Sequence, residues 1–547
     1  ASDVYKRQLQ QQQPGGLDHG WVSFFTYDPR VGAQIFANWV AALPNLQWIA
    51  GQLPLEVLKQ GDRITGVRFP DYMIQAQVTI DATELGDLLA LAEIPHRWGW
   101  ELQAEFEEPS APAVTSELTR RYPVQVPTWV VVMQDFGAGE TAPPIPPPPT
   151  YDPDRFAGAW KKYGAEMFLN YGRLPGDRFM INWPIHGNDY GEGVQRLVES
   201  NEQRQQFLQE ARWHSQGFAH FIQTQIDRRY GLAVDIFPEN QSALGGGAYA
   251  LHPYYRESRR LKGLVTVREQ DLLPIAGGCV APLSVSTTAA GCLQVESTCQ
   301  SVAIGNYVND HHYPSGDIAL QPKSMRWGGR WTGTPFTLPY GCLIPQAIDG
   351  FLVGEKNISV THMANGATRL QPLVLGIGQA AGMAAALCIE HQCQPRELSV
   401  QQLQTALLQD PTAPSAVIPL INLAPDAATW QRWQQYYLEH PEAYPGNGEC
   451  PLQSDAIADQ NATPLDNQGC DSASHEIFSG TFLREDTQIY SLQLSQPTGM
   501  EGETFSLVTL RPEVNDHLQQ LEPSCQLRVR GKLNRSGNWI LVETVLA

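Results

Sequence analysis

The residues best suited to chemistry lie in one stretch past the middle of the chain. An apolar run, Phe351 to Val353, is followed by Gly354 and Glu355. A buried strand that ends in a glycine and an acid places a carboxylate at the edge of a parallel sheet, where it can accept hydrogen bonds from a ligand's hydroxyl groups. The segment Gly376 to Leu387 is built mostly of small residues, so the start of a helix there could approach the ligand closely. Such helices also pack on sheets for purely structural reasons, and both interpretations remain open.

Histidines and arginines form a second set of candidates. The run Asp310-His311-His312-Tyr313 could bind a metal, but two adjacent histidines rarely converge on one ion without further ligands, so we expect no metal site. The charged run Tyr255 to Arg260 fits a solvated face or structural ion pairs; within it, Arg256 is our candidate for an inward guanidinium. His362 is as consistent with a satisfied interior histidine as with a catalytic one.

The elements that must position these residues can be outlined from the sequence pattern. Asp28-Pro29 before an apolar stripe predicts a helix, and strand-like runs at 46–49, 53–58, 64–69 and 73–80 predict a small antiparallel meander. The last of these runs continues through Asp81-Ala82-Thr83 into a leucine-rich helical stretch, so that strand, tight loop and helix follow one another.

Together these stretches resemble the FAD-dependent oxidoreductases of the glutathione-reductase-like type, in the branch often labelled xanthan lyase. The matching segments occur in the same order over roughly residues 25 to 395. They are residues 80–90, 181–190, 255–260, 303–307 with 310–312, 336–345 and 351–387. Several stretches in the right order are more specific than any one of them.

The resemblance implies a doubly wound α/β fold that binds FAD. Carried over residue by residue, it places Ala82, Thr83 and Gly86 near the adenine side of the cofactor and Gly354 and Glu355 at the ribityl chain. It further places Gly378, Gln379, Ala380 and Ala381 against the flavin or pyrophosphate. On the substrate side of the flavin we expect His312, with Arg256 and His362 as further candidates for catalysis.

One part of the family pattern has no counterpart in this sequence. The glycine fingerprint for the ADP half of FAD and its acidic ribose ligand, which come first in such proteins, are not found. The chain begins Ala1-Ser2-Asp3 without Met and runs into glutamines, which resembles translated adaptor sequence at a broken metagenomic reading frame. We therefore expect an N-terminally truncated chain that binds FAD poorly on its own.

The composition along the chain predicts six segments. We expect an artefact or disordered segment over 1–16, a partial FAD-binding domain with the meander over 17–100, and an inserted α+β substrate or cap region over 101–345. The second half of the FAD-binding domain follows over 346–410, then a linker or peripheral region over 411–475. The last segment, 476–547, reads as five strands with a helix between the third and fourth, which matches an OB-like barrel.

Charge and composition exclude several classes of partner. The formal net charge is −20, which disfavours nucleic acid and anionic membrane surfaces as partners. The apolar runs are shorter than the ~20 residues of a membrane span. Cys450 and Cys470 could pair if the protein is exported, but neither this pairing nor the localisation follows from the sequence.

Three functions are compatible with these features. The first is an FAD-dependent oxidoreductase that transfers a hydride between the flavin and a small-molecule or carbohydrate-derived substrate. The second is a carbohydrate-binding or polysaccharide-processing protein on a flavoprotein scaffold, suggested by the family label, the tryptophans and the barrel. The third is a non-catalytic interaction module.

Overall fold

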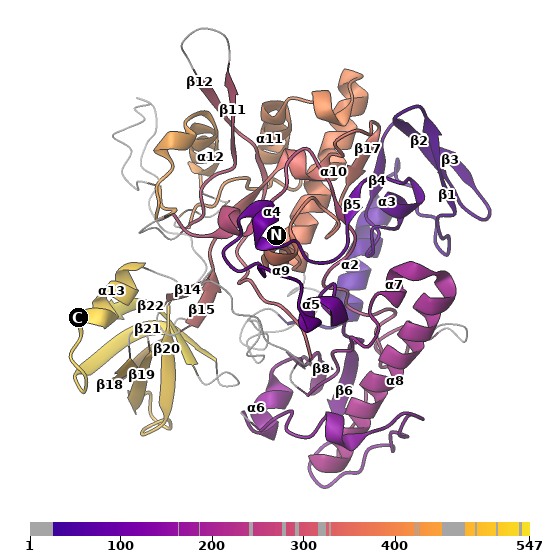
Figure 1. Ribbon diagram of the computed structural model, residues 1–547. Helices are drawn as coiled ribbons and strands as arrows, with labels where there is room; N and C mark the ends of the chain where they lie inside the picture. Colours follow the sequence, from indigo (N-terminus) through magenta and orange to yellow (C-terminus); the bar gives the residue numbers. More distant parts are fainter. Residues whose placement is uncertain are drawn as a thin grey trace.

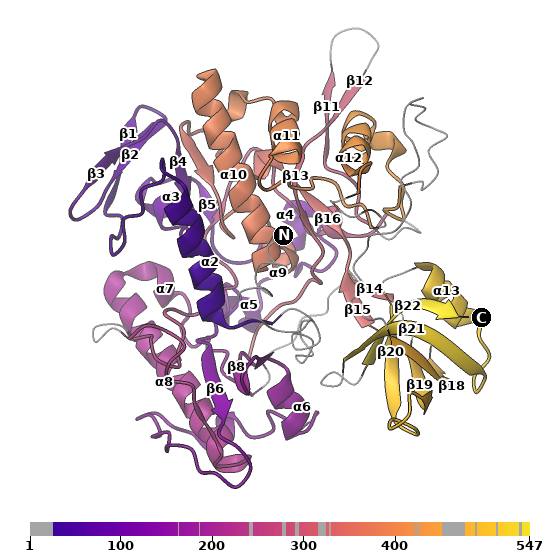
Figure 2. The same cartoon turned by 180° about the vertical axis from the view of Figure 1, so that it is seen from behind.

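The fold was described from a computed structural model. It covers residues 26–161, 163–184, 186–239, 244–275, 280–289, 295–314, 324–327, 330–421, 423, 425, 427–450, 476–486, 489–509, 512–534 and 539–546. The segment 1–16, residues 315–323 and Cys470 lie outside these ranges. The described residues form a mixed α/β structure with three large hydrophobic cores (Figures 1 and 2).

The N-terminal part supplies one helix and the predicted meander. Helix α2 (Pro29–Ala42) begins where Asp28 accepts a hydrogen bond from the Arg30 N–H and Pro29 takes the first helical position. Strands β1 (Glu56–Gln60), β2 (Arg63–Arg68) and β3 (Met73–Gln75) pair in this order as an antiparallel sheet. The strand expected over 46–49 is not formed, since no described strand lies beside this segment to complete its hydrogen bonds.

A parallel strand pair carries the glycine-acid motif. Strand β17 (Phe351–Val353) pairs with β4 (Thr79–Asp81), so that Val353 lies beside Asp81. Of the expected doubly wound sheet, the described residues contain only this parallel pair, because the other strands of the first core run antiparallel or belong to short hairpins. Those strands include β13 (Ser301–Gly305), which pairs with β16 (Phe336–Pro339).

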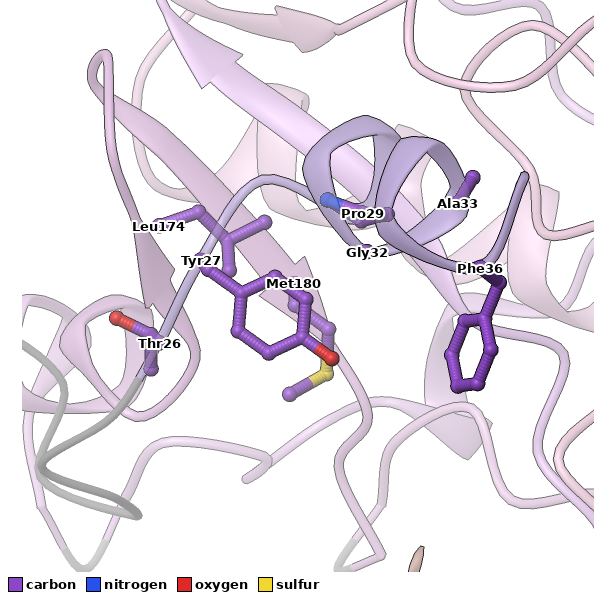
Figure 3. A pocket seen from close by; sticks show the side chains of 8 residues that line it. All are labelled: Thr26, Tyr27, Pro29, Gly32, Ala33, Phe36, Leu174 and Met180. Carbon is purple, nitrogen blue, oxygen red and sulfur yellow. The ribbon is translucent and has the colours of Figure 1, made fainter. Parts of the chain in front are cut away.

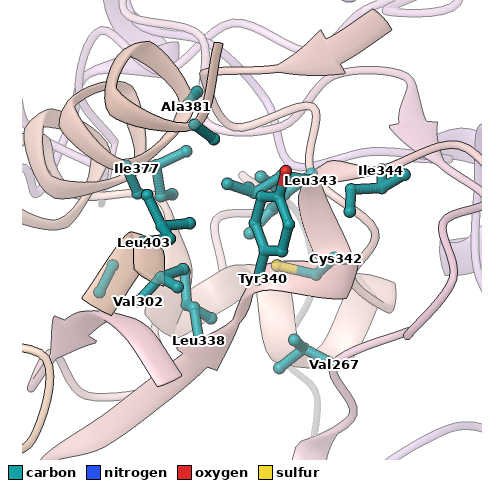
Figure 4. Close-up of a cluster of buried hydrophobic side chains, with 14 of the residues drawn as sticks. Val267, Val302, Leu338, Tyr340, Cys342, Leu343, Ile344, Ile377, Ala381 and Leu403 are labelled. Carbon is teal, nitrogen blue, oxygen red and sulfur yellow. The ribbon is translucent and has the colours of Figure 1, made fainter. Parts of the chain in front are cut away.

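Helix α10 (Gln371–His391) packs on both strand pairs and on α11 (Val400–Gln409). In Figure 4, Ile377 of α10 lies beside Leu403 of α11, near Val302 of β13. The helix is also long and apolar enough to cross a membrane, but core helices of soluble domains share these properties. The absence of a membrane span therefore stays a prediction.

The first core also contains α12 (Trp430–Glu439), which lies in the region expected to be a linker or peripheral. Trp430, Trp433 and Tyr437 of α12 are buried in the same core as β17 and α10. The low density of apolar residues around this helix concealed the fact that its few aromatic side chains all lie on one face. Residues 411–450 are thus part of the first core, and 451–475 lie outside the described residues.

The second core belongs to the inserted region. A four-stranded antiparallel sheet has the order β7 (Arg173–Leu174), β8 (Arg178–Ile181), β6 (Val131–Asp135), β9 (Tyr230–Leu232), and the long helix α8 (Asn201–Gln225) packs against it (Figure 1). The residues of this core end at Tyr255, and the next core residues along the sequence, Leu261, Val267 and Leu272, pack in the first core instead. The inserted region is therefore shorter than the expected 101–345.

The third core fills a closed five-stranded barrel that lies to one side of the rest in both views (Figures 1 and 2). Its strands are β18 (Glu476–Asp486), β19 (Ile489–Gln496), β20 (Thr504–Val508), β21 (Gln526–Asn534) and β22 (Trp539–Leu546). Around the barrel they follow the order β18-β19-β20-β22-β21, with helix α13 (Pro512–Gln520) between β20 and β21. The predicted five-stranded barrel is confirmed.

Shorter elements connect these parts. They are α3 (Asp87–Leu91), β5 (His96–Arg97), α4 (Gln103–Phe106), α5 (Glu117–Arg121), η2 (Pro153–Arg155), α6 (Ala165–Asn170), α7 (Arg196–Glu199), β10 (Arg260–Leu261), η3 (Glu269–Leu272), β11 (Val285–Ala289), β12 (Val295–Cys299), β14 (Ser324–Trp327), β15 (Arg330–Gly333), η4 (Tyr340–Leu343), α9 (His362–Thr368), η5 (Pro395–Glu397) and η6 (Pro441–Ala443).

Candidate functional site

The end of β17 meets α10 at a close contact where, apart from Ile80, the neighbours are glycine and alanine. A Cβ atom added to Gly354 would lie 2.9 Å from Ile80 Cγ2, 3.7 Å from Ala381 Cβ and 3.9 Å from Ala82 Cβ. A Cβ added to Gly378 would lie 3.7 Å from the Gly354 carbonyl oxygen. Four of the residues predicted to bind the cofactor are thus brought together, and Ala82 and Gly378 are exposed there. We call this the β17–α10 crossing.

Glu355 lies directly after the crossing and has an internal partner. Its carboxylate lies 2.6 Å from Lys356 Nζ, and Lys356 Nζ also lies 2.8 Å from Glu84 Oε2. Burial raises the pKa of Glu355, while the ammonium of Lys356 opposes this shift. The predicted ribityl ligand is therefore a mostly buried carboxylate, held in place by a lysine that is itself shared between two acids.

The remaining predicted cofactor residues have local structural partners. Asp81 accepts hydrogen bonds from the Thr83 N–H at 2.9 Å and its hydroxyl at 2.7 Å, and Thr83 Oγ1 in turn accepts from the Asp87 N–H. Gly86 adopts φ +62° at the start of α3, close to Arg259. The tight loop after β4 is thereby fixed in shape, with Ala82 at its exposed tip.

Two residues of α10 face away from the crossing. Gln379 Nε2 donates to the Ala413 carbonyl at 2.6 Å, and Ala380 is fully buried in the first core. Their neighbours Gly378 and Ala381 point to the crossing because a helix turns by about 100° per residue. Of the four residues predicted on α10, the structure thus places only Gly378 and Ala381 at the crossing.

A cluster of five charged residues lies on the side of the second core. We call it the Asp189 cluster: Asp189, Arg256, Asp310, His312 and Arg369. His312 lies between the two acids, with Nδ1 2.6 Å from Asp189 Oδ2 and Nε2 2.9 Å from Asp310 Oδ2. Arg256 lies 3.1 Å from Asp189 and Arg369 lies 2.8 Å from Asp310. Two predicted catalytic residues, His312 and Arg256, are therefore joined through an acid that was not predicted.

The basic groups of this cluster keep both acids ionised. Burial alone would raise the pKa of Asp189, yet Arg256 and His312 lower it to about 2. His312 and Arg369 likewise hold the pKa of Asp310 well below its ordinary value, against the effect of burial. Because both imidazole nitrogens face carboxylates, a doubly protonated His312 satisfies both acids, and three cations then face two anions.

The exposed edge of the Asp189 cluster is at Asp310. Its side chain is 35% exposed, whereas those of Arg369 and Asp189 are 2% exposed. Tyr307 donates to Asp310 at 2.9 Å and Tyr254 accepts from Arg369 at 3.0 Å, so two phenol groups flank the charged groups.

A second cluster, buried except for the partly exposed His311, contains the third predicted catalytic residue. His362 Nδ1 lies 2.9 Å from Glu257 Oε1, and its Nε2 lies 2.5 Å from the Tyr313 hydroxyl, which in turn lies 2.9 Å from His311 Nδ1. We call these four residues the Glu257 chain. The indole of Trp100 stacks on the His362 ring with 3.9 Å between centroids. The two clusters adjoin, since Arg256 and Glu257 are sequence neighbours, as are His311 and His312.

The segment 309–313 serves both clusters by alternation. Asp310 and His312 point into the Asp189 cluster, while Asn309, His311 and Tyr313 contact α9 and the Glu257 chain. Gly366 of α9 permits this approach, because a Cβ there would lie 2.1 Å from Asn309 Oδ1. An alternating pattern of polar residues was the one available sequence signal for two adjacent sites.

A separate cavity of about 470 Å³ lies between the start of α2 and strands β7 and β8 (Figure 3). Its lining is nearly all apolar and consists of Thr26, Tyr27, Pro29, Gly32, Ala33, Phe36, Leu174 and Met180. None of the residues predicted for the site lines it. The cavity offers shape and apolar contact but no acid–base group apart from the Tyr27 phenol.

Comparison with known proteins identifies the family. The sequence pattern of FAD dependent oxidoreductases matches residues 1–407. The chain belongs to this family. The match covers the second core and the first core as far as α11, including the β17–α10 crossing and both polar clusters, and ends before α12 and the barrel. No curated protein and no solved structure matches the chain.

The residues at the crossing fit one part of FAD. The exposed Gly378 and Ala82 leave backbone atoms open to close approach, and Glu355 lies at the end of β17, where a carboxylate can accept from hydroxyl groups. No glycine-rich turn between a strand and a helix stands before β1 among the described residues to cradle the pyrophosphate. The fit therefore concerns the ribityl and flavin part of the cofactor.

Proposed function

We propose that this protein oxidises or reduces a small organic substrate by hydride transfer at FAD, with the substrate bound against the Asp189 cluster. The observation that carries the proposal is the position of His312 between two ionised carboxylates and near two guanidinium groups, in a chain whose β17–α10 crossing leaves room for a flat cofactor. Bound FAD supplies the group that accepts or donates the hydride.

The chain's own groups bind the substrate and manage its charge. Counted with a protonated ring at His312, the Asp189 cluster carries one net positive charge, which favours a substrate with a carboxylate or another anionic group. A small-molecule acid or an acidic, carbohydrate-derived compound has this chemistry. Arg369, Tyr254 and Tyr307 at the exposed edge are the groups that such a substrate meets first.

We further propose that the full-length protein continues upstream with a strand and helix that complete the FAD site. Exposed apolar side chains on α2 and the segment after it support this: Trp48 is 71% exposed and Leu53 75%. Leu375 on α10 is 58% exposed beside Gly378. A doubly wound sheet extended past β4 would cover such residues and give 46–49 a partner. FAD content of the chain as given, compared with that of a longer reading frame, tests this; equal content would disprove it.

The central test is flavin reduction in the protein that retains FAD. His312→Asn is expected to keep FAD content while slowing flavin reduction by ~10²–10⁴, the usual contribution of a general acid or base. Its melting temperature should fall, because Asp189 and Asp310 lose a shared partner, so reduction is compared at a temperature where both proteins are folded. His311 lies in the Glu257 chain, so His220, which contacts only the Ile145 carbonyl among its described hydrogen bonds, is the better control. If the flavin in His312→Asn is reduced at the wild-type rate, His312 takes no part in proton transfer during the reaction.

A second function is favoured by the barrel. Its strand order, with β20 parallel to β22 and a helix between the third and fourth strands, is that of an OB-like barrel, a type that binds oligosaccharides as well as oligonucleotides. Arg528 and Arg530 are exposed on β21 opposite uncharged residues of β18 and β22. We propose binding of an acidic oligosaccharide there. Titration calorimetry with uronate oligomers against neutral ones is the test, and equal heats for both would refute it.

A further inference from the structure

The hydrogen-bond geometry of the Glu257 chain fixes where its protons lie. His311 Nε2 is 3.2 Å from the Met363 carbonyl, which can only accept, so in a neutral His311 the hydrogen is on Nε2 and Nδ1 accepts from the Tyr313 hydroxyl. The phenol oxygen must then accept from His362 Nε2. His362 Nδ1 is left to accept, and the only donor facing it is a protonated Glu257.

From this pattern we infer that Glu257, His362, Tyr313 and His311 form a proton relay that stores a proton at Glu257 and presents it at His311. The inference deepens the proposed function, because a hydride transfer needs a matching proton transfer. Three protons shift together: from Glu257 to His362 Nδ1, from His362 Nε2 to Tyr313, and from Tyr313 to His311 Nδ1. The result is a Glu257 carboxylate and a His311 imidazolium, with no change in total charge or electrons.

The surroundings of Glu257 leave both states within reach. Arg260 Nε lies 2.9 Å from its carboxylate and favours ionisation, but the same guanidinium is bound by Glu101 at 2.8 Å and is thus already neutralised. The Gln125 N–H donates to the other oxygen of Glu257, and the charge of Arg369 also favours the ionised form. Complete burial opposes these groups and raises the pKa of Glu257 to about 7.

The two middle members of the relay, His362 and Tyr313, are held neutral. Burial and the charge of Arg260 keep the pKa of His362 well below its ordinary value, and burial raises that of Tyr313. A neutral imidazole and a neutral phenol are what a relay needs, because each must donate and accept one proton at once.

Near His311, at one end of the Glu257 chain, several buried amide groups lack a hydrogen-bond partner among the described residues. Asn309 Oδ1 lies 3.1 Å from His311 Nε2, while Asn309 Nδ2, Asn365 Nδ2 and Gln125 Oε1 are buried without a partner among the described residues. Gln125 and Asn365 bond to each other at 2.9 Å, and Asn365 precedes Gly366, which touches Asn309. Buried amides in this condition require a water molecule or a ligand, which is what a proton leaving His311 would also need.

When His311 gives up its proton, the Glu257 chain holds one proton fewer and Glu257 is ionised. A proton released when the substrate is oxidised can refill the chain in the opposite direction. The relay therefore serves both directions of the proposed reaction, and the adjacent Asp189 cluster keeps its own charges unchanged meanwhile.

Infrared spectroscopy of the FAD-free protein tests the relay. At about pH 6 we expect a protonated carboxyl band that shifts in D₂O, is absent in Glu257→Gln, and moves in frequency and titration midpoint in Tyr313→Phe. Tyr340→Phe is the matched control, since Tyr340 is also buried and its hydroxyl bonds only to the Pro395 carbonyl among the described contacts. Glu108→Gln identifies the band of the other buried acid whose pKa is raised to about 7.

Two results would overturn the relay: no carboxyl band lost in Glu257→Gln, or a band in Tyr313→Phe that is the same as in the wild type. If Tyr313→Phe does not fold, ¹⁵N NMR of the wild-type histidines decides, because the relay requires hydrogen on Nε2 and not on Nδ1 of His362. None of these measurements needs FAD. A protein that fails to reduce flavin but shows the band would disprove the proposed function and not the relay.

Discussion

Asp189 is the residue on which the charged cluster depends. Its carboxylate accepts from His312, pairs with Arg256 and accepts from the Thr128 hydroxyl while almost fully buried. Removing one partner from a buried ion pair leaves an uncompensated charge, which typically costs about 3–5 kcal/mol.

We therefore predict that Asp189→Asn lowers the free energy of unfolding by roughly 3 kcal/mol, measured by urea denaturation. Asp271→Asn is the control, because the Asp271–Arg268 pair is exposed and such pairs contribute about 0–1 kcal/mol. Equal effects of the two substitutions would show that the Asp189 cluster is solvated and not buried.

Glu355 allows the cofactor contact to be separated from folding. Glu355→Gln keeps the size and one acceptor oxygen, and Lys356 retains its contact with Glu84. In a protein that binds FAD, we expect this variant to lose about 1.5–3 kcal/mol of binding free energy, the value of one hydrogen bond to a charged group. Equilibrium dialysis measures the loss; unchanged affinity would place Glu355 outside the site.

At the scale of elements, α10 makes opposite demands on stability and binding. Glycine within a helix costs roughly 0.5–1 kcal/mol relative to alanine, and a methyl group has room at both Gly378 and Gly382. Each Gly→Ala substitution should therefore raise the free energy of unfolding by that amount, measured by chemical denaturation of the chain without FAD.

FAD binding should distinguish the two glycines. Gly378 lies against Gly354 at the crossing, whereas Gly382 has no atom within 4 Å of an added Cβ. We expect Gly378→Ala to weaken FAD binding in spite of its greater stability and Gly382→Ala to weaken it less. A more stable Gly378→Ala protein with normal FAD affinity would contradict the close approach of the cofactor.

Sequence periodicity predicted the local elements well and their partners poorly. Helix α2, the meander and the five strands of the barrel follow directly from capping and alternation. Strand 46–49 failed because strand formation depends on a neighbour, which no local pattern can supply. For the candidate site, His312 and Arg256 were predicted from residue type and the family resemblance. Asp189 was not predicted, because only the fold brings this acid of segment 181–190 to His312.

At the scale of the whole molecule, pH acts on stability through two carboxyl groups whose pKa values are shifted in opposite directions. The pKa of Glu257 is raised from 4.5 to about 7, so between these values the folded chain holds a proton that the unfolded chain has lost, and stability falls as pH rises. The pKa of Asp189 is lowered from 3.8 to about 2, so its contribution is present above 3.8 and is lost as pH falls toward 2.

Thermal melts across pH should separate these contributions. Glu257→Gln stays neutral, so the stability difference, wild type minus variant, should decrease from pH ~5 to ~7 and be constant above. A difference that does not change with pH over this range would show that Glu257 is ionised throughout in the folded chain.

The three cores also predict that the barrel folds alone. Its buried residues contact one another in a closed sheet and belong to neither of the other cores. A fragment of residues 476–547 should give a β-type circular dichroism spectrum and a cooperative melt. A fragment that remains unstructured would show that the barrel needs the rest of the chain.

The alternation along 309–313 has a consequence for how this loop can change length. Surface loops usually tolerate insertions, because their side chains contact the protein on one side only or not at all. Here one extra residue before Asp310 would exchange the two sets of side chains: His311 would take the place of His312 beside Asp189, and Asp310 would take the place of His311, facing the Met363 carbonyl. This segment should therefore tolerate insertions or deletions of two residues better than of one, because only an even number keeps each side chain facing the same cluster.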